Sequence, residues 1–218
     1  MQPILADSDY VVQDEIPLGL PPIRVIHNHI DFVPGSVLPN IFSYRMIPKK
    51  HEKLKRQVDK LLERGFIKES MSLCVVPALL VSKKDGSWRM CVDSMAVNKI
   101  TVEYRFSIPR LNDLLLDQLY KASIFSKIDM QSGYHQFRMR LGDKWNSAFN
   151  IRDGLFEWMV ITFSLSNAFG TFMQFMNHIL KSCIGVSMVV YFDDIFVYIK
   201  IEANHLVHLH QVFSILRV

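Results

Sequence analysis

The stretch Ser187-Met-Val-Val-Tyr-Phe-Asp-Asp-Ile-Phe-Val-Tyr198 places two adjacent carboxylates, Asp193 and Asp194, within apolar, β-branched and aromatic residues. Burying a carboxylate is costly unless a cation or a metal ion compensates its charge. The apolar runs on both sides predict two short strands, so we expect the acids at the tip of a tight hairpin. Such a tip can hold a divalent ion. This stretch alone leaves a solvated acidic turn open as the alternative.

A second isolated acid strengthens the metal interpretation. Ile124-Phe-Ser-Lys-Ile-Asp129 is typical of a strand that ends in a carboxylate, 64 residues before Asp193. If two strands bring Asp129 beside Asp193 and Asp194, three carboxylates meet. That arrangement suits two-metal phosphoryl transfer, in which two Mg²⁺ ions lie about 3.5–4 Å apart. An ordinary strand-end turn former is the alternative for Asp129 taken alone.

A phosphoryl-transfer site also needs cations to hold a triphosphate. Lys83, Lys84 and Arg89 flank a predicted hairpin, in which Lys83-Lys-Asp-Gly-Ser87 supplies the turn between strand-like runs at 74–82 and 88–92. A triad of histidines, His205, His208 and His210, also suggests a metal site. No cysteine or acid completes that ligand set, so we favour a solvated helix face there.

The composition indicates one or two globular units, with half of the 218 residues hydrophobic and a net charge of +4. Eight Lys/Arg against three Asp/Glu make the segment Lys49–Lys68 locally basic. Such a segment suits either an anionic partner such as nucleic acid or a solvated helix face.

Three cysteines without a Cys-x-x-Cys spacing favour a reducing compartment. No signal peptide is expected. The uncharged run at 158–177 is too polar for a membrane span, and we expect a buried strand and helix there.

The order of patterns predicts an α+β fold with an antiparallel sheet. Seven of nine prolines precede residue 49, which favours an extended arm over residues 1–48. Helical spacing follows at 49–64, 111–119, 169–180 and from about 203 onward. Arg152-Asp153-Gly154 is a further turn signal between two strand-like runs.

Read together, these segments resemble the reverse transcriptase region of a Ty3/gypsy-type LTR retrotransposon polyprotein, most closely the plant elements. The resemblance runs from about Ile16 to Val218. Its motifs, in order, are Leu38-Pro-Asn40, Leu61-Leu-Glu-Arg-Gly-Phe-Ile67, Val76-Pro-Ala-Leu-Leu-Val81, Lys83-Lys-Asp-Gly-Ser-Trp-Arg-Met-Cys-Val-Asp93, Asn98-Lys-Ile-Thr101, Phe125-Ser-Lys-Ile-Asp129, Ser132-Gly-Tyr-His-Gln136 and Tyr191-Phe-Asp-Asp194. This colinearity nearly excludes an unrelated metal-dependent phosphotransferase.

The resemblance implies a polymerase right hand with fingers and palm only. Residues 1–48 would form the arm, 49–124 mainly fingers, 125–200 mainly palm, and 201–218 the start of a C-terminal helix, without thumb or RNase H. It implies that Asp129, Asp193 and Asp194 are catalytic and bind two Mg²⁺, with Mn²⁺ as a substitute. The implied dNTP-binding residues are Lys83 and Arg89 on the triphosphate, Tyr134 under the sugar and Phe163 lining the nucleotide pocket.

The implied partners are dNTPs and an RNA or DNA template with its primer, without a membrane. An intracellular, cytoplasmic location is the family expectation, and the oligomeric state stays open. Several positions depart from the family pattern: Met95 replaces an arginine, Ser107 a proline, Ser164 a glycine and Phe169 a proline, and Leu114-Leu-Leu116 adds one residue. These departures leave two hypotheses open, namely an RNA-directed DNA polymerase domain or a decayed, partly degenerate retroelement remnant that at most binds nucleic acid.

Overall fold

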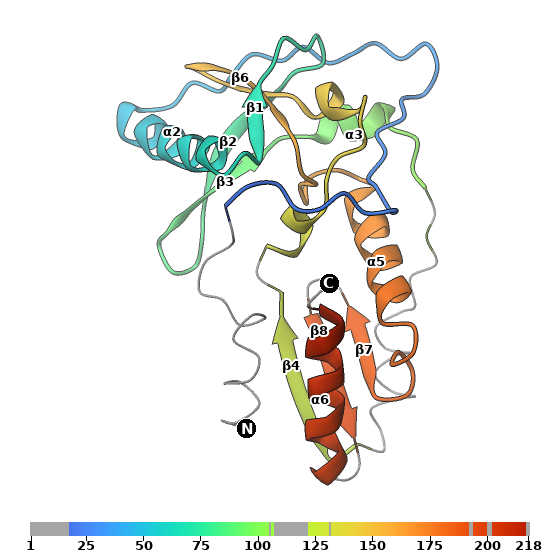
Figure 1. Ribbon diagram of the computed structural model, residues 1–218. Coiled ribbons are helices and arrows are strands. Elements are labelled where there is room, and N and C mark those ends of the chain that lie inside the picture. Colours follow the sequence, from blue (N-terminus) through green and yellow to red (C-terminus); the bar gives the residue numbers. More distant parts are fainter. Residues whose placement is uncertain are drawn as a thin grey trace. The chain divides into compact units, whose positions relative to one another are not determined.

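The apolar runs around the acidic stretch form a three-stranded antiparallel sheet in the computed structural model, which describes residues 18–104, 106, 122–130, 132–191, 194–199 and 202–216. Its strands are β4 (Ile124–Asp129), β7 (Met188–Tyr191) and β8 (Asp194–Ile199), in the order β4-β8-β7 (Figure 1). The predicted hairpin is confirmed, because β7 and β8 pair antiparallel from Met188–Val197 to Tyr191–Asp194.

The helix α6 (Glu202–Leu216) packs on one side of this sheet. His205 Nε2 lies 2.8 Å from Ser126 Oγ on β4, and the His205 side chain is only 3% exposed. The predicted solvated helix face is therefore wrong for His205. Its spacing from Leu209 and Val212, both buried, places it in the apolar stripe of the helix.

The second sheet has five strands in the order β1-β6-β5-β2-β3. Figure 1 labels β1, β2, β3 and β6 of this sheet. They are β1 (Ile67–Glu69), β2 (Val76–Ser82), β3 (Trp88–Val92), β5 (Phe149–Ile151) and β6 (Gly154–Trp158). Both predicted hairpins, β2–β3 and β5–β6, are confirmed. The pair β2–β5 is parallel, so this sheet is mixed rather than wholly antiparallel. The long chain segment between these two strands allows the crossover that a parallel pair requires.

The basic segment forms α2 (Pro48–Glu63), which contacts β1, β2 and β3. Proline suits the first helical position, and Leu54 and Val58 are buried against the sheet. Gly65 ends the helix at a φ of 71°, where its N–H donates to the Leu62 carbonyl at 2.9 Å and Phe66 N donates to the Leu61 carbonyl at 3.0 Å. This pair of bonds is a Schellman cap, which favours glycine at the left-handed position.

Short helices complete the described chain. They are α3 (Met95–Ile100), η1 (Gly133–Gln136), η2 (Lys144–Ser147) and α5 (Ala168–Ile179). The buried helix predicted at 169–180 is confirmed as α5, whereas the helix predicted at 111–119 lies outside the described residues. Among the described residues, no helix combines the length and apolar composition that crossing a membrane would need.

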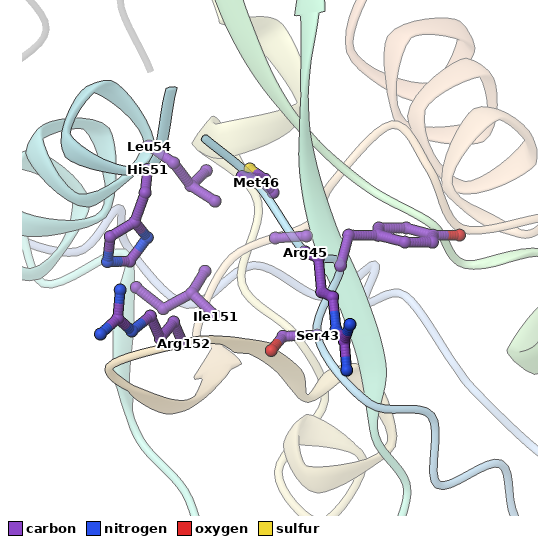
Figure 2. A pocket seen from close by; sticks show the side chains of 9 residues that line it. Ser43, Arg45, Met46, His51, Leu54, Ile151 and Arg152 are labelled. Atoms are coloured by element: carbon purple, nitrogen blue, oxygen red, sulfur yellow. The ribbon is translucent and has the colours of Figure 1, made fainter. Parts of the chain in front are cut away.

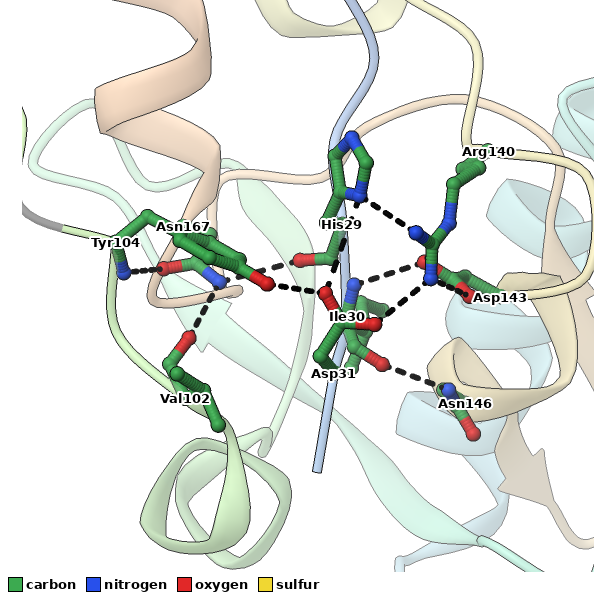
Figure 3. A network of polar contacts seen from close by, with 9 residues as sticks. All are labelled: His29, Ile30, Asp31, Val102, Tyr104, Arg140, Asp143, Asn146 and Asn167. Carbon is green, nitrogen blue, oxygen red and sulfur yellow. Dashed lines mark hydrogen bonds and ion pairs between the residues drawn. The ribbon is translucent and has the colours of Figure 1, made fainter. Parts of the chain in front are cut away.

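Residues 18–47 lie along the five-stranded part of the fold without forming a helix or a strand. A polar network fastens this N-terminal segment to loops far along the chain (Figure 3). Asp143 Oδ2 accepts from Ile30 N at 3.0 Å, and Arg140 bonds Asp143 and Asp31 at 2.8 Å each. Asn167 donates to the His29 and Val102 carbonyls and accepts from Tyr104 N. Side chains thereby satisfy backbone groups that an irregular segment leaves unpaired.

The chain divides into two compact units, each with one sheet. The larger unit comprises Leu18–Tyr104 and Tyr134–Phe169. The smaller unit comprises the described parts of Arg105–Gly133 and Gly170–Val218. The assignment of residues 49–124 mainly to the fingers and of residues 125–200 mainly to the palm stays a prediction.

Candidate active site

The register of the three-stranded sheet brings two of the three predicted catalytic acids together. Asp129, the last residue of β4, lies directly opposite Asp194, the first residue of β8. Directly opposed residues of an antiparallel pair have Cα atoms about 4.5–5.5 Å apart and side chains on the same face. Tyr191 lies opposite Asp194 on its other side. Asp193 lies outside the described residues, in the two-residue connection between Tyr191 and Asp194.

A lysine partly compensates the negative charge of this acid pair. Lys127 lies two residues before Asp129 on the same face of β4, and its Nζ is 2.9 Å from Asp194 Oδ2. The hydrogen bond to Asp194 raises the pKa of Lys127, and the negative charges of Asp194 and Asp129 act in the same direction. Ser126, on the opposite face, contacts α6, so Lys127 and Asp129 point away from that helix.

The donor set fits a hard divalent cation. Carboxylate oxygens are the ligands that Mg²⁺ prefers, and Asp129 and Asp194 supply them at one end of the sheet. The ammonium of Lys127 already occupies the position of a cation at Asp194. Within the described ranges, no three His, Cys, Asp or Glu side chains gather around one point. The third predicted ligand, Asp193, is beyond those ranges.

The four residues predicted to contact the dNTP belong to the larger unit. Arg89, on β3, lies with its guanidinium carbon 5.9 Å from the centroid of the Phe163 ring. Phe163 is 52% exposed, so this cation–π pair presents an aromatic face and a positive charge at the surface. Lys83 begins the β2–β3 turn, where its N–H donates to the Ser87 carbonyl at 2.8 Å and its side chain is exposed. The turn therefore presents a second cation.

Tyr134 lies in η1 and is partly exposed. Its neighbour His135 is held between two aromatic rings, with centroid distances of 5.3 Å to Phe66 and 5.6 Å to Trp158. Burial lowers the pKa of His135 to about 4. A neutral imidazole thus packs the short helix that carries Tyr134 against the five-stranded sheet.

The structure accommodates three of the positions that depart from the family pattern, whereas Ser107 and the inserted residue at 114–116 lie outside the described residues. Ser164 Oγ lies 2.8 Å from Ser94 Oγ and 3.1 Å from Thr162 Oγ1, so its added hydroxyl is hydrogen-bonded. The helix α5 forms with Phe169 at its second position. Met95, in place of an arginine, is 66% exposed at the start of α3.

A cavity of about 320 Å³ lies between the N-terminal segment, α2 and the β5–β6 hairpin (Figure 2). Leu54, Ala78 and Ile151 provide apolar lining, whereas Arg45 and Arg152 add two guanidinium groups. His51, also lining the cavity, pairs with Asp153 at 2.8 Å. The lining can accept an anionic group beside an apolar surface.

Residues 81–218 match the sequence family described as Reverse transcriptase (RNA-dependent DNA polymerase). The chain belongs to the reverse transcriptase family. Its resemblance to a Ty3/gypsy-type retrotransposon is also confirmed by sequence relatives. The Transposon Tf2-3 polyprotein of Schizosaccharomyces pombe is 31% identical over 196 residues, and the Transposon Tf2-7 polyprotein of the same yeast is 30% identical. Each match covers 90% of this chain and 15% of the polyprotein, so the reverse transcriptase chain spans a small part of these relatives.

Solved structures confirm the predicted α+β right-hand fold of the reverse transcriptase chain. A prototype foamy virus protease-reverse transcriptase superposes with a TM-score of 0.85 at 24% identity, over 99% of this chain and 28% of that one. A foamy viral protease-reverse transcriptase in complex with RNA/DNA hybrid gives a TM-score of 0.83 at 26% identity, over 98% and 28%.

Sequence reasoning missed one residue of this site, Lys127. The signal was present, because Lys127 precedes Asp129 by two positions and a strand places such residues on one face. Its partner could not be read from the sequence, since the pairing depends on the register of β4 against β8.

Proposed function

We propose that this chain is the fingers–palm part of an RNA-directed DNA polymerase that adds dNTPs to a primer strand by two-metal phosphoryl transfer. The observation that carries the proposal is the register that sets Asp129 opposite Asp194, next to the two-residue connection that contains Asp193. Membership of the reverse transcriptase family supports the same chemistry.

In this proposal the three carboxylates hold two divalent ions, Mg²⁺ or in its place Mn²⁺. Such ions lower the pKa of the primer 3′-hydroxyl and neutralise the charge on the leaving pyrophosphate. The 3′-hydroxyl would release its proton to water and its oxygen would form a bond to the α-phosphorus of the dNTP, while the bond from that phosphorus to pyrophosphate breaks. Asp129, Asp193 and Asp194 orient the reacting groups at the end of the sheet.

The larger unit would supply the nucleotide contacts. Lys83 and Arg89 provide cations for the triphosphate oxygens, and guanidinium groups bind phosphate in a bidentate manner. Phe163, already stacked against Arg89, would line the nucleotide pocket. Tyr134 would lie under the sugar and disfavour a 2′-hydroxyl. The template and primer, which a related foamy viral enzyme holds as an RNA/DNA hybrid, would be bound through phosphates and shape.

A second candidate is a remnant that binds primed template without extending it. The substitutions at Met95, Ser164 and Phe169 favour this candidate. The resemblance places Met95 near the template path and Ser164 at the nascent base pair, and Phe169 adds bulk where the family has a proline suited to the first position of a helix. The three free cysteines, Cys74, Cys91 and Cys183, support a reducing, intracellular compartment for either function.

Primer extension on a primed RNA template, with Mg²⁺ or Mn²⁺, tests the proposal. We expect weak extension by the wild-type chain and a loss of about a hundredfold or more in Asp194→Asn, because metal ions supply several kcal/mol of transition-state stabilisation. Asp193→Asn is expected to lose primer extension to a similar extent. Asp153→Asn, an acid in the β5–β6 turn, serves as the matched control.

Equal extension by the wild type and Asp194→Asn would refute the metal role of that carboxylate. Absence of extension with retained binding to the primed template would favour the remnant.

A further inference from the structure

The acid pair of the smaller unit carries its own counter-cation. Asp129 and Asp194 are directly opposed across two strands, a position in which like charges destabilise an antiparallel pair. Lys127 is a diagonal neighbour of Asp194, because its own register partner is Phe196. Diagonal neighbours lie within reach of long side chains, and the Lys127 ammonium uses this reach to contact Asp194 Oδ2 at 2.9 Å.

This contact is accessible to competition. The Lys127 side chain is 53% exposed and that of Asp194 is 30% exposed. Exposed ion pairs contribute little to stability, so another cation can replace the ammonium at small cost. The oxygen that Lys127 contacts is also one that a divalent ion at Asp194 would require.

We propose that Lys127 is a positioning residue that serves as a resident counter-cation for Asp129 and Asp194 and yields Asp194 to a divalent ion when the metal binds. The proposal rests on the proposed function and deepens it, since it concerns how the same acids are held before metal arrives. Two effects follow for a chain that lacks this charge. The acids repel each other without metal, and a divalent ion binds them more tightly because it no longer competes with an ammonium.

Mn²⁺ binding to the purified chain, followed by electron paramagnetic resonance of free Mn²⁺ without substrate, tests this directly. A divalent ion about 4 Å from an ammonium in a water-like dielectric loses affinity by roughly tenfold or more, so Lys127→Met is expected to bind Mn²⁺ about tenfold more tightly than wild type. Lys127→Arg, which retains the charge, is expected to restore the wild-type affinity. The metal-free melting temperature of Lys127→Met should fall, and saturating Mn²⁺ should return it to the wild-type value.

Lys68→Met is the matched control, because Lys68 is 55% exposed and pairs with Glu157 at 3.0 Å in the larger unit. It is expected to leave Mn²⁺ affinity unchanged. Circular dichroism checks that each variant is folded, and Lys127→Gln provides a second neutral variant.

The outcomes separate this inference from the proposed function. Unchanged Mn²⁺ affinity in Lys127→Met and Lys127→Gln, together with lost binding in Asp194→Asn, would overturn the counter-cation role and leave the metal site standing. The neutral variants could bind Mn²⁺ more tightly while the wild-type chain extends no primer. That result would support the counter-cation role of Lys127 and contradict the polymerase function. Absence of Mn²⁺ binding in every variant would overturn both the counter-cation and the metal role.

Discussion

At the scale of single residues, the protein keeps some ionisable side chains charged and others neutral. Asp129 and Asp194 remain at an exposed strand end, where Lys127 compensates them. His135 lies between Phe66 and Trp158, where burial favours the neutral imidazole. The first arrangement can exchange its cation, whereas the second resists protonation.

The packing of His135 predicts a pH dependence. Folding lowers the His135 pKa from 6.5 to about 4, so the unfolded chain binds a proton more readily, and the stability that His135 contributes is present above pH 6.5 and lost as the pH falls toward 4. Between pH 7.5 and pH 5, the free energy of unfolding of the wild type should fall by about 2 kcal/mol more than that of His135→Phe. Urea unfolding at the two pH values measures this difference. His210→Phe, at an exposed position of α6, is the control and should keep the wild-type slope. The same pH dependence in wild type and His135→Phe would contradict a neutral histidine held between Phe66 and Trp158.

At the scale of elements, α2 uses its basic residues in two ways. Lys55 pairs with Asp59 and Arg56 pairs with Glu52 within the helix. Lys50 and Lys53 instead lie over the Trp88 ring, at 4.7 and 5.8 Å from its centroid. The helix therefore offers fewer available cations to a phosphate backbone than its sequence suggests.

The salt dependence of template binding measures this contribution. Each phosphate contact adds roughly 0.7–0.9 to the slope of log affinity against log salt. If α2 contacts the backbone, Lys49→Gln/Lys60→Gln, which changes two exposed lysines of α2, should lower the slope by about 1–2 in fluorescence-polarisation titrations at several salt concentrations. Lys55→Gln, which removes a cation already paired with Asp59, is the control. A slope that the double variant leaves unchanged would show that the exposed face of α2 is merely solvated.

Most elements could be predicted because their patterns are local. The strand Ile124–Asp129, the turn at Arg152-Asp153-Gly154 and the glycine stop at Gly65 depend on neighbours within a few residues. The parallel pairing of β2 with β5 and the burial of His205 depend on partners distant in sequence. Resemblance to a family indicated the acids, but only the register showed that Lys127 contacts one of them.

At the scale of the whole molecule, contacts over long sequence separations hold the larger unit together. Ile30 N bonds Asp143 across 113 positions, and Asn167 bonds the His29 carbonyl across 138 positions (Figure 3). Such contacts form only after large loops have closed, so they are expected to slow the folding of this unit. The N-terminal segment is thus part of the larger unit rather than an appendage.

Removal of Asp143 should destabilise this unit. Asp143→Ala leaves the buried Ile30 N without its acceptor and removes one of the two carboxylates that Arg140 contacts, at a cost of about 1–3 kcal/mol. All three tryptophans of the chain, Trp88, Trp145 and Trp158, belong to the larger unit, so their fluorescence reports its unfolding in urea. Asp59→Ala, which breaks an exposed pair on α2, should cost less than about 0.5 kcal/mol. Equal fluorescence midpoints for the two variants would refute the structural role of Asp143.

The two-residue connection between Tyr191 and Asp194 also limits how the gene can change in length. Side chains alternate along β8, so if one codon were inserted or deleted and the pairing kept its count from Tyr191, every later residue of the strand would shift to the opposite face. Asp194 would then turn toward the α6 side, and Ile195 and Val197, now buried, would face outward. Substitutions in the connection leave the number of residues between β7 and β8 unchanged. A point substitution at the first connecting position therefore leaves all three acids in the sequence, whereas a length change sets the position of Asp194 against the burial of Ile195 and Val197.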